Sequence, residues 1–198
     1  MQKLPRPLTL FATVMLLAAF GGVVYAETPA ATAGPAMRDG SHDFDFEMGK
    51  WKMHNRRLPK KFVGSHDWVE FDSHSEAHPM PGVIGNEDVY RTDYFAKGFV
   101  GLTFRLYNPK TGLWRIYWVD SMSQPGEMGT SVVGKFTGNV GVFEGPDTYD
   151  GKPIVVRYTW TVNPKGSPIT SHFEQAFSAD GGKTWEPNFT NDLTRDED

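Results

Sequence analysis

The chain has 198 residues, with 20 lysines and arginines, 24 aspartates and glutamates, a formal net charge of −4 and no cysteine. The absence of cysteine excludes disulfide bonds, acylation as a lipoprotein, a thiol nucleophile and a thiolate metal site. The acidic balance argues against binding to nucleic acid or to an anionic membrane surface, because both favour basic patches.

Residues 1–26 have the pattern of an export signal. Lys3 and Arg6 form a short positive segment, and an apolar stretch follows over residues 8–24. Residues 24–26 then place small side chains at the usual positions before a cleavage site. The apolar stretch is short for a membrane span. We therefore expect a protein that is periplasmic or secreted, with no membrane insertion after signal cleavage.

The rest of the chain divides into a leader and one domain. Residues 27–40 are rich in alanine, proline, glycine and threonine, which predicts a flexible leader. Residues 41–198 are long enough for a single domain with a substantial core. Period-two alternation dominates in this domain and predicts strands. The expected strands cover residues 51–58, 68–77, 87–94, 99–107, 113–120, 131–136, 142–144, 154–162, 170–178 and 185–193.

Turn sequences separate the expected strands, among them Asn108-Pro-Lys-Thr-Gly112 and Asp180-Gly-Gly182. About ten short strands at hairpin spacing predict an all-β fold with one antiparallel sheet. At this length the pattern favours an up-and-down barrel of about ten strands, because closure removes the exposed sheet edges.

Alternation also sorts the expected strands into two faces. The apolar set, which we expect inside the barrel, consists of Leu102, Phe104, Leu106, Trp114, Ile116, Trp118, Ile154, Val156, Tyr158, Trp160, Phe173, Gln175 and Phe177. The set expected outside consists of Thr103, Arg105, Tyr107, Arg115, Tyr117, Arg157, Thr159, His172 and Glu174. In the first strand the same rule places Trp51, Met53, Asn55 and Arg57 inside.

The expected interior is mostly aromatic with a few polar groups, which is typical of concave sites for small molecules. We therefore predict a site for a small apolar or aromatic molecule. The residues predicted to bind it are Trp51, Asn55, Arg57, Trp118, Tyr158, Trp160 and Gln175. The alternative is that the aromatic side chains simply fill the barrel.

Residues 178–185 match the Asp-box pattern Ser-x-Asp-x-Gly-x-Thr-Trp at every specified position. The pattern predicts a tight hairpin in which the aspartate accepts hydrogen bonds from turn amides. Sialidase-type propellers carry this motif repeatedly and away from their chemistry. One copy in a chain of this length is therefore a structural signal and not a functional one.

His74, Glu76 and His78 share one face of an expected strand, and they are the strongest candidates for metal ligands. Glu70 and Asp72 lie on the same face, which indicates a solvated outer surface. We therefore predict no metal site at this strand.

His172 could be imagined as a haem ligand, but Phe173 and Phe177 are expected to occupy the interior and to turn His172 outward. The sequence contains no nucleophile elbow, phosphate-binding loop or dinucleotide fingerprint. No cofactor is therefore predicted.

Several segments together carry a family resemblance. They are Asp43-Phe-Asp-Phe46, Gly49-x-Trp51, Arg56-Arg-Leu58, Trp68-Val-Glu-Phe71, Gly85-Asn-x-Asp88, Leu102-Thr-Phe-Arg-Leu-Tyr107, Trp114-Arg-Ile-Tyr-Trp118, Gly151-Lys-Pro-Ile154 with Arg157, and Glu174-Gln-Ala-Phe-Ser178. With these segments the chain resembles a large group of uncharacterised bacterial proteins with a calycin-like domain of unknown function. The resemblance implies a calycin or lipocalin-like barrel, opened by Gly49-x-Trp51, and no established activity.

Two other functions stay open. The cavity could carry out a lyase, isomerase or hydrolase step with one buried acid or base, and Glu70, Asp88 and Arg57 are the first candidates if the inside and outside faces are reversed. A buried carboxylate beside an arginine would favour catalysis, whereas a purely aromatic pocket would favour binding. A filled barrel with an exposed apolar patch would instead favour a structural or interaction role in the cell envelope.

Overall fold

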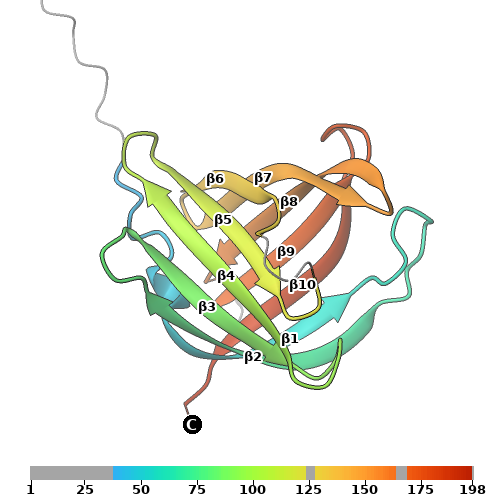
Figure 1. Ribbon diagram of the computed structural model, residues 1–198, viewed down its shortest axis with the longest axis horizontal. Coiled ribbons are helices and arrows are strands. Elements are labelled where there is room, and N and C mark those ends of the chain that lie inside the picture. Colours follow the sequence, from blue (N-terminus) through green and yellow to red (C-terminus); the bar gives the residue numbers. More distant parts are fainter. Residues whose placement is uncertain (1–37, 124–127, 164–168, 198) are drawn as a thin grey trace, which may run out of the picture. The chain divides into compact units, whose positions relative to one another are not determined.

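The computed structural model describes residues 38–123, 128–163 and 169–197. The predicted export signal and most of the predicted leader lie outside the described residues. The described part contains one short 3-10 helix, η1 (Asp45–Glu47), and ten strands (Figure 1). The strands are β1 (Gly49–Arg57), β2 (Val69–Pro79), β3 (Gly85–Thr92), β4 (Phe99–Asn108), β5 (Leu113–Asp120), β6 (Ser131–Thr137), β7 (Val140–Tyr149), β8 (Lys152–Val162), β9 (Ser171–Ser178) and β10 (Glu186–Arg195).

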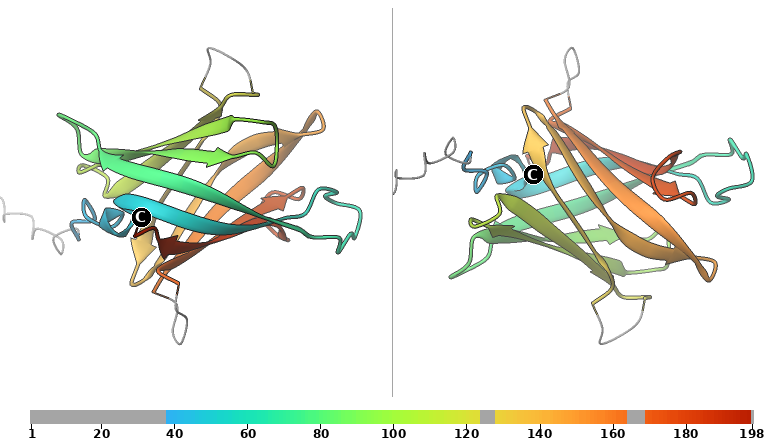
Figure 2. Two further views of the ribbon diagram at one scale, coloured as in Figure 1. Left: turned by 90° about the horizontal axis from the view of Figure 1, so that it is seen from below. Right: turned by 90° about the horizontal axis from the view of Figure 1, so that it is seen from above.

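The ten strands form a closed antiparallel barrel in which each strand pairs with its neighbours in sequence (Figure 1, Figure 2). The pairing of β1 with β10, from Trp51 opposite Arg195 to Arg57 opposite Phe189, closes the barrel. The predicted fold class is therefore confirmed as an up-and-down barrel of ten strands. No helix of the described ranges is long and apolar enough to cross a membrane.

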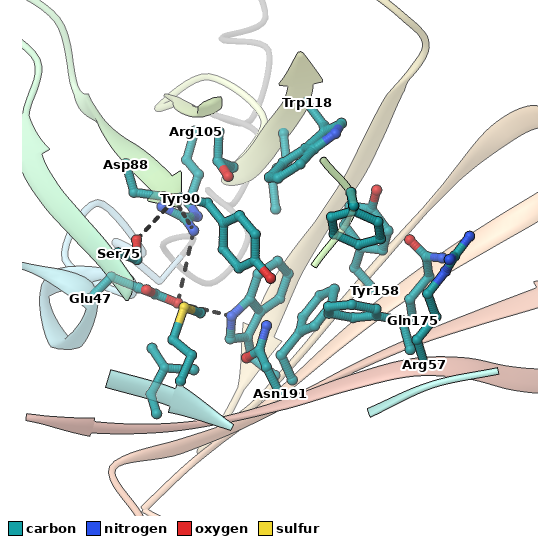
Figure 3. Close-up of a pocket in the computed structure, with 18 of the residues that line it drawn as sticks. Glu47, Arg57, Ser75, Asp88, Tyr90, Arg105, Trp118, Tyr158, Gln175 and Asn191 are labelled. Carbon is teal, nitrogen blue, oxygen red and sulfur yellow. Dashed lines mark hydrogen bonds and ion pairs between the residues drawn. The ribbon is translucent and has the colours of Figure 1, made fainter. Parts of the chain in front are cut away.

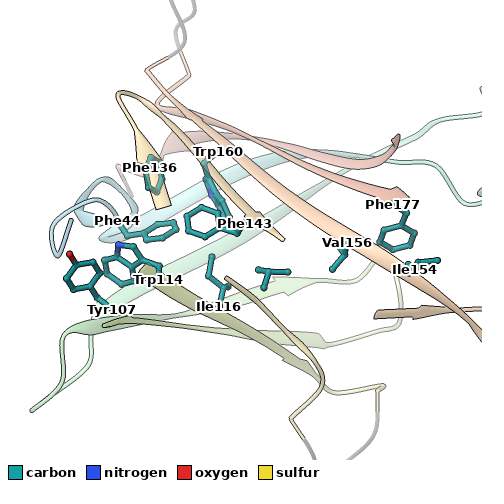
Figure 4. Close-up of a cluster of buried hydrophobic side chains, with 11 residues drawn as sticks. Phe44, Tyr107, Trp114, Ile116, Phe136, Phe143, Ile154, Val156, Trp160 and Phe177 are labelled. Atoms are coloured by element: carbon teal, nitrogen blue, oxygen red, sulfur yellow. The ribbon is translucent and has the colours of Figure 1, made fainter. Parts of the chain in front are cut away.

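The segment before β1 closes one end of the barrel. Phe44 is completely buried, and its ring meets those of Trp114 and Trp160 edge-on, with centroids 5.0 and 5.3 Å away (Figure 4). The Gly40 N–H donates to the Tyr107 hydroxyl, and the Gly40 carbonyl accepts from Trp114 Nε1, both at 2.9 Å. The last residues of the predicted leader therefore contact the barrel.

Two clusters of buried side chains form the core. The larger consists of Phe44, Tyr107, Trp114, Ile116, Val132, Phe136, Phe143, Ile154, Val156, Trp160 and Phe177 (Figure 4). The smaller consists of Trp51, Met53, Tyr90, Phe99 and Leu193. Because an aromatic side chain buries about 150–250 Å², these clusters supply much of the hydrophobic stabilisation that a chain without disulfides needs.

The orientation predicted for β4 is wrong. The residues of β4 found inside are Thr103, Arg105 and Tyr107, and those on the outer face are Leu102, Phe104 and Leu106. Tyr107 lies opposite Trp114, and Arg105 lies opposite Ile116. Residues directly opposite one another in a sheet point to the same face, so Trp114 and Ile116 bring these two side chains inside. The turn at residues 109–112 has an even number of residues, which places odd positions of β4 opposite even positions of β5.

In the other strands whose faces were predicted, namely β1, β2, β5, β8 and β9, the faces follow the prediction. In β1, Met53 and Asn55 are buried, and Lys52 and His54 are exposed. In β2, the buried residues are Ser73, Ser75 and Ala77. In β8, the buried residues are Ile154, Val156 and Trp160. The interior is therefore mainly apolar. Its buried charged residues, Glu47, Asp88 and Arg105, come from η1, β3 and β4.

Candidate functional site

A cavity of about 290 Å³ lies inside the barrel (Figure 3). This volume lies just below the usual range for ligand pockets, about 300–1,000 Å³, and fits a small molecule. Its aromatic lining consists of Tyr90, Phe95, Trp118, Tyr158, Trp160, Phe173 and Phe189. Its polar and charged lining consists of Glu47, Arg57, Lys61, Ser75, Asp88, Thr103, Arg105, Gln175 and Asn191, and its aliphatic lining of Met53, Ile116 and Leu193.

One end of the cavity holds an ionic cluster of Glu47, Asp88 and Arg105 (Figure 3). Arg105 Nη2 lies 2.7 Å from Asp88 Oδ1 and 3.9 Å from Glu47 Oε1. Exposure is 3% for Glu47, 5% for Asp88 and 4% for Arg105, so water screens none of these charges well. A charge buried to this extent is tolerated only with a partner, which makes the Asp88–Arg105 pair the centre of the cluster.

Hydrogen bonds fix the orientation of this pair. Ser75 Oγ donates to Asp88 Oδ2 at 3.2 Å, and Arg105 Nη1 donates to Asn86 Oδ1 at 3.0 Å. Asp88 Oδ1 meets Arg105 Nη2 as an ion pair without the alignment of a hydrogen bond, and Arg105 Nε makes no hydrogen bond to a described residue. The pair therefore keeps hydrogen-bonding capacity at the cavity surface.

Glu47 is held by two tryptophans. Trp160 Nε1 donates to Glu47 Oε1 at 2.9 Å, and Trp51 Nε1 donates to the Glu47 carbonyl. Burial raises the pKa of the Glu47 carboxyl; Arg105 opposes this shift, and the charge of Asp88 adds to it. When Glu47 is protonated, Asp88 alone balances Arg105 and the cluster is neutral. A protonated carboxyl in a cavity can donate a proton to a bound molecule.

Gly49 allows Glu47 and Trp51 to meet. Its φ of +100° lies in the region that favours glycine, and it turns the chain from η1 into β1. A Cβ at Gly49 would also lie 2.7 Å from Arg195 Nη1. The Gly49-x-Trp51 pattern therefore has a local reason, because the turn folds the Glu47 carbonyl back onto the indole of Trp51.

Neutral polar groups line the middle of the cavity. The Tyr90 hydroxyl donates to Asn55 Oδ1 at 3.4 Å. Burial raises the pKa of Tyr90 to about 12, although a hydrogen bond with Ser73 partly opposes it. Burial also raises the pKa of Tyr158. Both phenols therefore stay protonated at neutral pH. Asn191 also lines the cavity, and its buried Oδ1 accepts no hydrogen bond from a described residue.

The opposite end of the cavity is cationic (Figure 3). Arg57 and Lys61 both line it. The Arg57 guanidinium lies over the Phe95 ring, with Cζ 5.3 Å from the centroid. Gln175 lines the same end, and its Nε2 donates to Asn188 Oδ1 at 2.7 Å. The cavity therefore joins an internally paired ionic cluster to a pair of basic side chains.

The structure brings together five of the seven residues predicted to bind a ligand. They are Arg57, Trp118, Tyr158, Trp160 and Gln175, and all line the cavity. Trp118 also donates from Nε1 to Asp120 Oδ2 at 2.9 Å, which fixes the plane of its ring. Their role in binding stays a prediction.

Trp51 and Asn55 are buried inside the barrel but do not line the cavity. The guanidinium of Arg195 stacks on the Trp51 ring, with Cζ 3.8 Å from the ring centroid. The Asn55 amide donates to the Phe71 carbonyl at 3.1 Å and to Ser73 Oγ at 2.8 Å. Both side chains are therefore committed to the structure of the barrel.

Glu47 and Arg105 are not among the site residues predicted from the sequence. Asp88 is a predicted catalytic candidate only if the inside and outside faces of the strands are reversed. The available signal was the turn at residues 109–112, whose even length places Arg105 on the face of Ile116. Glu70, the other carboxylate considered for catalysis, lies outside, with its Oε1 3.2 Å from Arg56 Nε.

His74, Glu76 and His78 lie on the outer face of β2, and about half or more of each side chain is exposed. His78 Nε2 lies 3.4 Å from Glu76 Oε1, whereas His74 Nδ1 lies 3.5 Å from Asp196 Oδ2. No group of three residues that could hold a metal ion occurs in the part of the chain that the structure describes.

Comparison of the sequence with models of known protein families finds no family that matches. Comparison with curated proteins likewise finds no similar sequence. The geometry of the cavity is therefore the basis for the function proposed below.

Proposed function

We propose that this protein binds a small, partly apolar or aromatic molecule in the cavity of its barrel. The observation that carries the proposal is the cavity itself, an internal space of about 290 Å³ with seven aromatic side chains and polar groups at both ends. Aromatic walls provide apolar contact area, and a few fixed polar groups set the orientation of a ligand. This combination supports binding over a barrel that is simply filled.

A screen of small aromatic compounds by intrinsic tryptophan fluorescence tests the proposal. Trp118 lines the cavity, and Trp68 lies outside it over Arg56. We expect ligands to change the emission of the wild type and of Trp68→Ala, and to have a smaller effect on Trp118→Ala, in which Trp160 is the tryptophan left in the cavity wall. A response that Trp68→Ala abolishes and Trp118→Ala preserves would place binding on the outer surface and contradict the proposal.

We also propose that the chain is exported and acts in the periplasm or outside the cell. The support is the pattern of residues 1–26, with its positive start, apolar stretch and small residues before Glu27. Cell fractionation followed by N-terminal sequencing is the test, and we expect a mature protein that begins at Glu27. An uncleaved protein in the cytoplasm would contradict the proposed export.

We also propose that the chain belongs to the calycin-like group. The up-and-down order of the strands supports this proposal.

A second candidate function is catalysis in the same cavity. The observation that favours it is a carboxyl group of raised pKa, Glu47, beside the buried Asp88–Arg105 pair. Glu47 would act as the acid of a lyase, isomerase or hydrolase step. Ligands found by the screen would be incubated with the protein and analysed for products. We expect Glu47→Gln to keep binding and to lose turnover, whereas unchanged turnover would exclude this role for Glu47.

A further inference from the structure

The basic end of the cavity lacks the counter-charges that the other end has. Among the described residues, no carboxylate forms an ion pair with Arg57, and its recorded contact is the Phe95 ring. Lys61 likewise makes no ion pair within the described ranges, and its Nζ lies over the rings of Tyr149 and Phe177 at 5.2 and 5.6 Å. Both side chains are only partly exposed. Two cations therefore line the same cavity, each against aromatic rings.

The charge of Arg57 affects the protonation of Lys61. Burial lowers the pKa of Lys61, the charge of Arg57 lowers it further, and Glu186 partly opposes both. Withdrawal from water and repulsion by Arg57 both disfavour the charged form of Lys61. An anion between Arg57 and Lys61 would relieve both effects.

Glu186 and Asp120 carry carboxylates near this end, but hydrogen-bond donors from the protein already occupy them. The Glu186 oxygens accept from the Phe62 N–H at 2.8 and 3.0 Å. Asp120 lines the surface hollow next to the cavity and accepts from Trp118 Nε1, from the Met122 N–H and from the N–H and hydroxyl of Ser123. Neither residue lines the cavity itself.

The other end of the cavity does not compete for an anion. Arg105 is neutralised by Asp88 at 2.7 Å, and Glu47 adds a second carboxyl group to that end. Arg57 also lines the adjoining surface hollow together with Phe95 and Trp118, so it stands where the cavity meets the surface. A negative group entering from this side would meet Arg57 first.

We propose that the ligand is a small aromatic carboxylate, with its carboxylate against Arg57 and Lys61 and its ring among the aromatic walls. This inference rests on the proposed binding function and specifies its ligand class. The planar guanidinium matches the two oxygens of a carboxylate, and the ammonium of Lys61 adds a second charge. Tyr90 and Asn191, in the middle of the cavity, would contact a polar substituent on the ring.

Three ligands that share one ring system and differ in charge test the inference, namely 2-naphthoate, 2-naphthamide and 2-naphthylmethylammonium. Their affinities for the purified protein are measured by calorimetry. We expect 2-naphthoate to bind about ten- to hundredfold more tightly than 2-naphthamide, as charge-assisted hydrogen bonds would give, and the ammonium to bind most weakly. Equal affinity for naphthoate and naphthamide would overturn the inference and leave the binding function intact. Binding of none of the three would overturn both.

Variants separate local recognition from overall charge. Arg57→Met and Lys61→Met each remove one cation from the cavity, and Arg56→Met removes one from the outer face, where Arg56 pairs with Glu70. We expect the two cavity variants to lose about tenfold or more in affinity for 2-naphthoate and to bind 2-naphthamide as the wild type does. Arg56→Met should bind both as the wild type does. An equal loss in all three variants would attribute the preference to net charge and refute the site.

Discussion

Asp88 and Arg105 lie diagonally across the β3–β4 pair, each two positions from the residue directly opposite the other, with Asp88 Oδ1 2.7 Å from Arg105 Nη2. Both side chains point into the barrel and are buried. Arg105 therefore points inward although alternation in β4 predicts that it faces solvent. The carboxylate of Asp88 on the neighbouring strand β3 balances its charge. The pair is the reason that a charged residue can occupy an aromatic interior.

Removing the cation of this pair should destabilise the protein strongly. Arg105→Met leaves the Asp88 carboxylate buried without its counter-charge, and we expect the free energy of unfolding to fall by about 3–5 kcal/mol at neutral pH. Urea denaturation followed by tryptophan fluorescence measures this loss.

Arg157→Met is the matched control for Arg105→Met. Arg157 Nη2 also lies 2.7 Å from a carboxylate, that of Glu144, but this pair is on the surface, and Arg157 stacks on the Trp185 ring as well. A surface pair and a stacked guanidinium are each worth about 1 kcal/mol or less, so we expect a loss of at most about 2 kcal/mol. A loss as large as that of Arg105→Met would contradict the importance of burial.

The raised pKa of Glu47 predicts a dependence of stability on pH. In the folded protein the pKa of Glu47 lies above its ordinary value of 4.5, so the folded state retains a proton that the unfolded state releases. The free energy of unfolding should therefore decrease as the pH rises from about 4.5 through the raised pKa, and Glu47→Gln should lack this decrease. We expect the stability of the variant relative to the wild type to increase with pH across that window.

Urea denaturation over a series of pH values measures this difference for Glu47→Gln. Glu70→Gln, on the outer face, controls for the loss of one carboxylate from the chain. If the difference between Glu47→Gln and the wild type is the same at every pH, the carboxyl group is not the source of the effect.

The strands and their order could be predicted from the sequence because both depend on local features. Alternation marks a strand such as β5, where Trp114 and Ile116 are buried and Arg115 is exposed. Short turns between successive strands allow only antiparallel neighbours, and closure then pairs the first strand with the last. The segment predicted at 142–144 was too short, because Gly141 and Gly145 interrupt the apolar alternation of β7.

The ionic end of the cavity could not be predicted in the same way. The rule that the apolar face of a strand points inward fails where the interior contains a compensated charge, as for Arg105. Glu47 belongs to a three-residue helix with no periodicity, and its burial depends on Trp160, which is 113 positions away in the sequence. Only the three-dimensional arrangement brings Glu47, Asp88 and Arg105 together.

The Asp-box turn provides a test of stability at acidic pH. The Asp180 carboxylate accepts hydrogen bonds from the Thr184 hydroxyl at 2.6 Å and N–H at 2.9 Å, from the Ser178 hydroxyl at 2.7 Å and from the Lys183 N–H at 3.0 Å. These bonds hold the pKa of Asp180 well below its ordinary value of 3.8. Their stabilisation is therefore complete above about pH 3.8 and is lost as the pH falls through the lowered pKa.

We expect Asp180→Ala to lower the melting temperature at pH 7, and we expect its difference from the wild type to shrink as the solution is made more acidic than pH 3.8. Thermal unfolding followed by circular dichroism measures both. Asp67→Ala, in the exposed β1–β2 loop, is the control variant. A difference between Asp180→Ala and the wild type that persists unchanged in acid would show that the charge of Asp180 does not stabilise the turn.

The close approach of Gly101 to Trp118 links the backbone of β4 to the cavity wall. A Cβ added at Gly101 would lie 2.1 Å from Trp118 Cη2, so the ring must move in Gly101→Ala. Moving it disturbs the hydrogen bond to Asp120 and changes the cavity lining, and we expect a loss of about 1–3 kcal/mol in unfolding free energy. Affinity for any ligand of the cavity should fall as well. Gly129→Ala is the control, because, apart from its chain neighbours, no described residue has an atom within 4 Å of a Cβ built there. Denaturation and calorimetry with 2-naphthoate compare the two variants, and equal behaviour would show that Trp118 has room to move without affecting the site.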